Sequence, residues 1–207
     1  SGAGATVNGV SFAAGNSTTS LGGDVTMSGL DSVDPGSYIG SNPIGLSSAY
    51  QTMLKGGAWN NGASATITLN NLTSGRPYLV QFWVADYRSF ANNRTETLDG
   101  SVTLNYLNTG SGQYAIGRFT ADAATQTINI AANESAQMNA IQLRDITGVW
   151  NGAASTNLNN SEANFNGGSY TTMSGLGVPV TSLFFADTDG FGNSMAAKNN
   201  ITVDAAG

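Results

Sequence analysis

The stretch SATITLNNLTSGRPYLVQFWVAD, residues 64–86, decides the fold class of this chain. Residues 64–72 alternate apolar side chains with threonine and asparagine, and residues 76–86 continue with a longer β-branched and aromatic run. A period of two is typical of antiparallel strands, because successive side chains point to opposite faces of a sheet. Ser74-Gly75 is a turn-forming pair between the two runs. The stretch therefore predicts two strands connected by a turn.

The same pattern recurs along the first two-thirds of the chain, with turn-forming pairs such as Asp99-Gly100 between the runs. Further strands are predicted at residues 101–107, 113–121, 125–132 and 139–146. Only residues 47–57 have the character of a helix, and Gly56-Gly57 would serve as its C-cap. Evenly spaced short strands without helical periodicity indicate an all-β fold, a jelly-roll β-sandwich over residues 1–146.

The composition changes after Ile146. Residues 148–170 are almost uncharged and rich in Asn and Gly, which places a domain boundary near Thr147. We expect residues 147–207 to form a second, β-rich segment. Because the final strand ends with the chain, we expect the sequence to be part of a larger multidomain protein and to be monomeric.

Two absences exclude whole classes of chemistry. The 207 residues include no Cys and no His, which removes thiolate nucleophiles, Ser-His-Asp triads and most transition-metal sites. Seven basic against 13 acidic residues, a net charge of −6, disfavour nucleic acid and anionic membranes. No apolar run approaches the ~20 residues of a membrane-spanning helix. The Asn-, Gly- and Thr-rich composition is typical of a secreted or cell-surface bacterial protein.

Most of the chain resembles known modules of large secreted bacterial proteins. The first resemblance is to galactose-binding-type jelly rolls, the shape shared by many carbohydrate-binding modules, and it rests on residues 7–12, 50–88, 94–100, 113–130 and 137–146. The second, carried by VWNGAASTNLNNSEANFNGG (149–168) and continuing to ITVDAAG (201–207), is to the opening of autotransporter-associated β-strand repeats. These repeats imply the start of a parallel β-helix, and the jelly rolls often carry a structural calcium ion.

One face of the strand at residues 76–88 has the composition of a sugar-binding surface. Gln81, Trp83 and Tyr87 share this face with smaller side chains, and Gln142 and Arg144 point outward from the strand at 139–146. Aromatic rings stack on the C–H faces of sugars, while amides and guanidinium groups bond the hydroxyls. If the two strands share a sheet, these residues form one platform. Alternatively, Trp83 fills the space between the sheet and a covering loop.

Trp59 is the second aromatic candidate. It lies in GGAWNNG, residues 56–62, which reads as a Gly- and Asn-rich loop where a large apolar ring is hard to cover. Stacking on a ligand and packing against the protein are both compatible with this position.

Charged side chains cluster at Asp86, Arg88, Arg94 and Glu96, beside Tyr87 and Phe90. The favoured interpretation is a salt-bridged clamp that closes the loop at residues 87–93, with direct ligand contact as the alternative. Asp86 and Glu96 are also the best candidate pair for glycoside hydrolysis. An Arg near each of them would lower its pKa and spoil a general acid, so we expect no enzymatic activity.

A calcium site is the only cofactor that the sequence suggests. DTDGFGN, residues 187–193, resembles part of a calcium loop through Asp187, Asp189 and Asn193, although a plain Asp-Gly turn is the simpler interpretation. No cofactor is required for the expected function.

These observations favour a non-catalytic carbohydrate-binding module that binds a neutral polysaccharide, such as xylan or a β-glucan, and targets an attached enzyme or surface protein to it. The alternative is a structural spacer or adhesin domain of a bacterial surface protein, without a glycan site.

Overall fold

The computed structural model describes residues 4–39, 45–106 and 112–146, and the backbone of four short strands within residues 148–203. The chain forms two compact units. The first comprises Ser1–Ser74 and Leu79–Leu143, and the second comprises Gly75–Tyr78 and Arg144–Gly207. Among the described residues, no helix has both the length and the apolar character needed to span a bilayer.

The largest sheet has five antiparallel strands in the order β3-β6-β11-β8-β9. Ile67 of β6 pairs with Ile128 of β11, and both Ile67 and Leu69 are fully buried. The alternation read from residues 64–72 is thus confirmed. The strands are β3 (Val25–Ser28), β6 (Ser64–Leu69), β8 (Thr95–Leu98), β9 (Val102–Asn105) and β11 (Gln126–Ala132).

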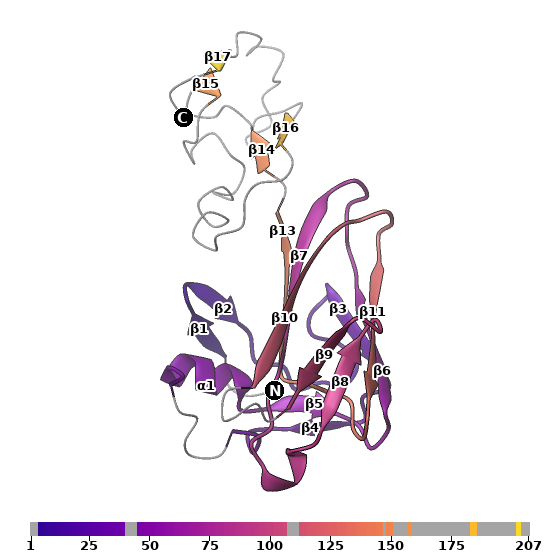
Figure 1. The fold of residues 1–207 in the computed structure, drawn as a ribbon. Coiled ribbons are helices and arrows are strands. Elements are labelled where there is room, and N and C mark those ends of the chain that lie inside the picture. The colour runs from indigo at the N-terminus through magenta and orange to yellow at the C-terminus, as the bar shows by residue number, and fades with distance from the viewer. Residues whose placement is uncertain are drawn as a thin grey trace. The chain divides into compact units, whose positions relative to one another are not determined.

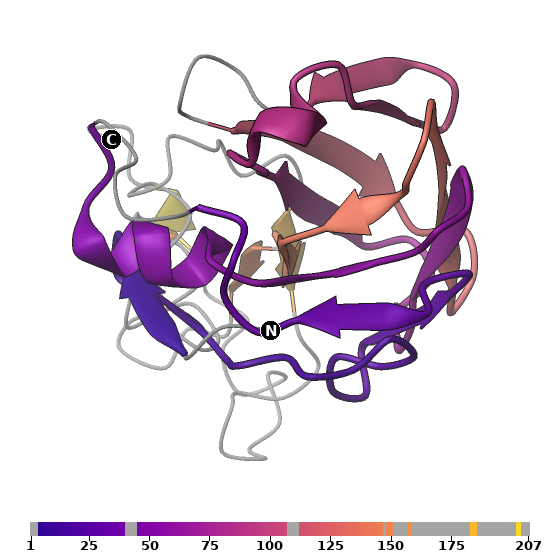
Figure 2. The same ribbon diagram turned by 90° about the horizontal axis from the view of Figure 1, so that it is seen from below.

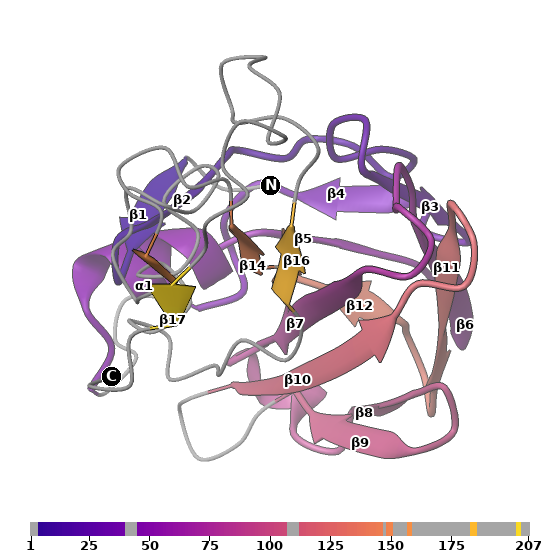
Figure 3. The same ribbon diagram turned by 90° about the horizontal axis from the view of Figure 1, so that it is seen from above.

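A second sheet has the order β10-β7-β13, with β7 (Pro77–Val84) between β10 (Gln113–Thr120) and β13 (Ala140–Asp145). Figures 1 and 3 show β10 running beside β7. The expectation that the strands at 76–88 and 139–146 share a sheet is therefore confirmed. A third sheet, β12-β5-β4, consists of β4 (Ser32–Asp34), β5 (Gly57–Trp59) and β12 (Gln137–Met138). The fold is mostly β, and its antiparallel sheets are consistent with a β-sandwich; the jelly-roll order stays a prediction.

A short helix, α1 (Ser48–Leu54), packs with the hairpin of β1 (Ala5–Val7) and β2 (Val10–Phe12), as Figure 2 shows. Ser47 caps α1, its hydroxyl accepting a hydrogen bond from the Tyr50 N–H at 3.3 Å. The predicted Gly56-Gly57 cap is wrong, because the C-cap is Lys55 in right-handed helical conformation. Gly57 instead begins β5, where a Cβ atom would lie only 2.7 Å from the Met138 carbonyl oxygen.

The second unit contains two parallel strand pairs. β14 (Gly148–Trp150) pairs with β16 (Leu183–Phe185), and β15 (Asn157–Leu158) pairs with β17 (Thr202–Val203). Four such short strands do not make a β-helix, so the resemblance to a β-strand repeat stays a prediction.

Candidate functional site

The second sheet has two faces of different character. Val80 and Phe82 of β7 line a cavity together with side chains of the five-stranded sheet, so they face inward. Trp83 and Ala85 belong to a separate core cluster with side chains of β1 and α1, so they face the other way. Because side chains alternate along a strand, Gln81 shares the face of Trp83. We name this side the outer face of the β10-β7-β13 sheet.

Trp83 lies beneath the segments that cover part of the outer face. Its side chain is 4% exposed, its Nε1 donates a hydrogen bond to Tyr50 Oη at 2.6 Å, and the Phe12 ring meets it edge-on at 5.5 Å. An indole enclosed in this way offers no open ring face for a sugar. The expectation of an exposed Trp83 platform is therefore corrected, and the alternative that Trp83 fills the space under a covering segment is confirmed.

Trp59 and Tyr87 are half-buried and pack against the same core cluster as Trp83. Trp59 ends strand β5 and pairs with Ser32 and Gln137, so the predicted exposed loop is wrong. The Tyr87 hydroxyl is buried with no hydrogen-bond partner in the part of the chain that the structure describes, and burial raises its pKa to about 12. Contact of either ring with a ligand stays a prediction.

The rest of the outer face is open. Gly117 of β10 lies against Val80, because a Cβ atom added to it would be 3.5 Å from Val80 Cγ1, so Gly117 faces inward. Its neighbours along the strand, Ile116 and Arg118, therefore face outward, together with Tyr114. Tyr114 is 56% exposed and Ile116 is 54% exposed, and Arg118 is exposed as well.

Tyr114 lies near the covered end of this face. The pKa of the Tyr50 hydroxyl is raised mainly by burial and in smaller part by Tyr114, while its hydrogen bond with Trp83 lowers it. The exposed part of the outer face thus begins beside the segments that cover Trp83 and continues along β10.

Gln142 connects the outer face with a groove. Ala140 packs against the cluster that contains Trp83, so alternation along β13 places Gln142 on the outer face too. Gln142 also lines a groove of about 450 Å³ between β13 and the segment at residues 10–22. The side-chain amides of Gln81 and Gln142 form no hydrogen bond with any residue that the structure describes, and both side chains are half-exposed. They can therefore bond a ligand.

Arg144, the remaining predicted platform residue, lies on β13 but belongs to the second unit. Its Nη1 atom is buried without a hydrogen-bond partner among the described residues, and burial lowers its pKa. A role of Arg144 in ligand binding stays a prediction.

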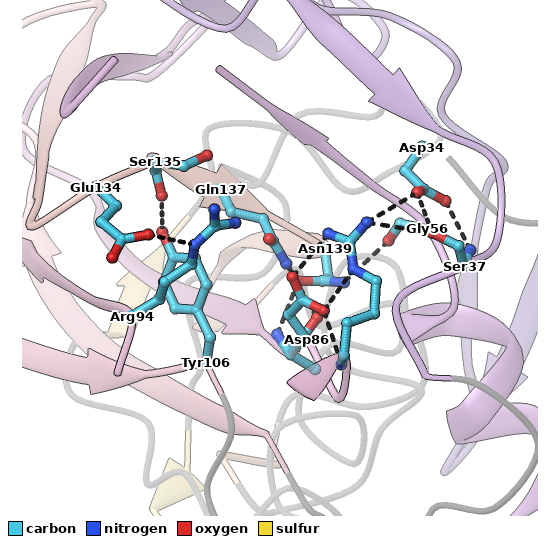
Figure 4. A network of polar contacts seen from close by, with 12 residues as sticks. Asp34, Ser37, Gly56, Asp86, Arg94, Tyr106, Glu134, Ser135, Gln137 and Asn139 are labelled. Carbon is cyan, nitrogen blue, oxygen red and sulfur yellow. Dashed lines mark hydrogen bonds and ion pairs between the residues drawn. The ribbon is translucent and has the colours of Figure 1, made fainter. Parts of the chain in front are cut away.

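The pair at the start of the charged cluster is a clamp, as expected. Arg88 Nε donates to Asp86 Oδ1 at 2.8 Å and Arg88 Nη2 to Asp86 Oδ2 at 2.7 Å, while Asp86 is fully buried. The Arg88 guanidinium also lies 4.5 Å from the centre of the Tyr38 ring and 3.7 Å from an Asp34 oxygen. Hydrogen bonding to Asp86 is the main cause of the raised pKa of Arg88. Asp34 and Ser37 extend this network (Figure 4).

The other two charges of the cluster do not pair with each other. Arg94 Nε donates to Glu134 at 3.0 Å, and Glu96 is fully buried, accepting hydrogen bonds from Tyr106 Oη at 2.8 Å and the Gln137 N–H at 3.0 Å. Burial raises the pKa of Glu96 to about 8. The expectation of a low pKa at Glu96 is corrected, because the neighbouring Arg94 side chain is engaged elsewhere. Figure 4 shows Arg94 directed toward Glu134, and Tyr106 bonded to Ser135.

The positions of the acidic side chains decide whether they can act in catalysis or hold a metal ion. Asp86 is bonded on both oxygens to Arg88 and Glu96 is enclosed, so neither carboxylate faces the groove or the outer face. Within residues 4–39, 45–106 and 112–146, no three acidic side chains come together to hold a metal ion. Asp187, Asp189 and Asn193 lie outside the described residues.

Comparisons with known proteins give structural likeness only. No family model and no curated protein matches the chain. A family 35 carbohydrate-binding module from Clostridium thermocellum is similar over 58% of this chain and 92% of its own, at 15% identity and a TM-score of 0.34. A module of the same family, from Cellvibrio japonicus Abf62, is similar over 58% of this chain and 96% of its own, at 18% identity and a TM-score of 0.29.

A β-glucuronidase from Bacteroides uniformis is similar over 52% of this chain, at 13% identity and a TM-score of 0.39. The chain spans 14% of the length of that enzyme.

Proposed function

We propose that this chain is a non-catalytic module that binds a neutral polysaccharide through the open part of the outer face. The observation that carries the proposal is the combination of the exposed Tyr114 ring with the amides of Gln81 and Gln142, which have no partner among the described residues, on the same face of one sheet. Amides donate and accept hydrogen bonds with sugar hydroxyls, and a phenol ring can stack on the C–H face of a pyranose.

The positions of these groups suit an extended ligand. They lie on three adjacent strands, and neighbouring strands are about 4.8 Å apart, so the surface spans more than one sugar ring. The groove beside Gln142, about 450 Å³, falls within the usual size of ligand sites. Arg118 adds donors at the β10 edge.

Affinity would be modest, because an open surface must order a flexible chain and recovers only part of that cost. The proposal includes a secreted or cell-surface location, with the module keeping an attached enzyme or surface domain close to its polysaccharide. Xylan and β-glucans are the first candidates. The proposal assigns a structural calcium ion to the segment at residues 187–193 and to no other part of the chain.

A specific observation favours the alternative of a spacer domain without a glycan site. The two indoles at Trp59 and Trp83, the strongest stacking groups near this surface, are both engaged in packing. The two functions differ in whether Tyr114 contributes to glycan binding, since its ring remains exposed.

Affinity gel electrophoresis against xylan, β-glucans, mannans and pectins tests the proposal. We expect retardation by at least one glycan, lost in Tyr114→Ala and weakened in Gln142→Ala. Phe90→Ala is the control for an exposed aromatic side chain, since Phe90 is 59% exposed but lies on the 3-10 helix Ser89–Ala91 and not on a strand of the β10-β7-β13 sheet. Absence of retardation, or equal retardation of the Tyr114 and Phe90 variants, would support the spacer.

A further inference from the structure

A cavity of about 310 Å³ lies between the two main sheets, on the opposite side of β7 from Trp83. Its lining is dominated by side chains of β6, β7, β8, β10 and β11: Leu69, Val80, Phe82, Leu98, Phe119 and Ile128. Nothing in the proposed function uses it.

The cavity has a direct cause in the sequence of β10. The inward positions of this strand include Ala115 and Gly117, where a close-packed sandwich core would carry branched side chains. Opposite Gly117, Val80 is half-buried, although it points toward the five-stranded sheet. Small side chains on an inward strand therefore leave the volume that the cavity occupies.

Two edge strands border the cavity. β9 ends the five-stranded sheet and β10 ends the second sheet, and the Asn105 N–H donates to Gln113 Oε1 at 2.5 Å where the two strands approach. Val102 of β9 lines the cavity farther along and is 45% exposed. An apolar side chain thus borders an accessible entrance.

The charges around the cavity favour a neutral ligand. Asp99 contributes a carboxylate to its lining, whereas Arg118 lines it from β10 with its side chain directed to the outer face. One Asp99 oxygen already accepts a hydrogen bond from the Asn129 N–H at 2.8 Å. That oxygen is therefore engaged, and the apolar remainder of the lining favours a neutral molecule that replaces water with dispersion contacts.

We propose that this cavity binds a neutral, predominantly apolar small molecule, which enters between β9 and β10. Apolar cavities hold water poorly and accept apolar guests of matching size, and this volume lies at the lower end of known ligand sites.

The test is a fluorescence titration of the full chain with N-phenyl-1-naphthylamine, an uncharged probe that brightens in apolar surroundings. We expect saturable enhancement that 1-decanol displaces. Gly117→Val and Ala115→Ile place side chains in the cavity and should weaken probe binding at least about tenfold. Tyr114→Ala is the matched control on the same strand, since its side chain faces outward, and should bind the probe like the unmodified chain.

Circular dichroism and urea unfolding verify that each variant is folded. If the larger replacements prevent folding, Gly117→Ala continues the test, because its Cβ makes only an ordinary contact with Val80. Non-saturable enhancement, or equal binding by the folded filled variants, would overturn the proposal. The filled variants should retain glycan retardation, so failure of this site is distinguishable from failure of the carbohydrate site.

Discussion

Asp86 and Arg88, only two residues apart, face each other as a bidentate ion pair that closes the end of β7. The carboxylate is fully buried, whereas the guanidinium reaches the surface and stacks over Tyr38. The backbone N–H of Arg88 also donates to Asp86 Oδ1 at 3.1 Å. A single carboxylate therefore determines both the chain turn and the position of the guanidinium.

Replacement of Asp86 by Asn should destabilise the protein by about 2–4 kcal/mol, because a buried charge-assisted pair loses its anion. The free energy of unfolding in urea measures the loss. Glu134→Gln is the control, since it removes the partner of Arg94 at a site where the carboxylate side chain is 54% exposed. Its cost should stay within about 1 kcal/mol. Equal losses in the two variants would contradict the structural role of the buried pair.

Stability should decrease as pH rises from about 5 to about 8, because of Glu96. Burial raises the pKa of this carboxyl from 4.5 to about 8, so the folded protein retains a proton that the unfolded chain releases in this range. The full contribution is present below pH 4.5 and is lost as pH approaches 8, with a slope of up to about 1.4 kcal/mol per pH unit.

Glu96→Gln tests this pH dependence, because the amide cannot ionise and its oxygen can still accept from Tyr106. The difference in unfolding free energy between this variant and the unmodified chain should grow in favour of the variant as pH rises from 5 to 8. A pH-independent difference would show that Glu96 does not titrate in this range.

Trp83 and Tyr50 should be energetically coupled through the hydrogen bond that holds the indole beneath α1. Tyr50→Phe leaves the buried Nε1–H without its acceptor and should cost about 1–3 kcal/mol. In a double-mutant cycle with Trp83→Phe, the coupling energy should be about 0.5–2 kcal/mol. Additive losses would mean that the ring of Tyr50, rather than its hydroxyl, supports the indole.

Asn139 should be among the most sensitive positions of the first unit. Its Oδ1 accepts from the Ala85 N–H at 2.8 Å and from Gln137 Nε2 at 2.9 Å, while its Nδ2 donates to the carbonyls of Leu54 and Gly56. Asn139→Ala should destabilise the protein by about 2–4 kcal/mol, because it leaves buried polar groups without partners.

Asn105→Ala provides the comparison for Asn139, since this side chain is exposed. Its effect on the urea midpoint should be small, and a comparably large effect would indicate that Asn139 has no special role.

The local pattern predicted the long strands well. The alternation in residues 64–86 gave the inward side chains of β6 and β7, and Asn71, Asp99, Gly75 and Gly100 adopt the positive φ angles that their turns require. The three-residue strands β4 and β5 were missed because so few residues carry no detectable period.

Long-range contacts limited the prediction of the site. Nothing near Trp83 in sequence indicates that Phe12 and Tyr50 would cover it, or that Glu134, 40 residues away, would pair with Arg94. Tyr114 is not among the predicted platform residues, although the alternation of Tyr, Ile and Arg with Ala and Gly along β10 carries the signal for one open face.

The amide of Asn139 secures the end of α1 from 85 residues further along the chain. A ribosome must therefore synthesise nearly the whole first unit before the Leu54 carbonyl finds this hydrogen-bond donor. Contacts of such wide separation slow folding, since a long loop has to close first. During that delay the carbonyls of Leu54 and Gly56 would stay hydrated in the nascent chain, although Met53 and Leu54 can already pack against Val7 and Tyr38.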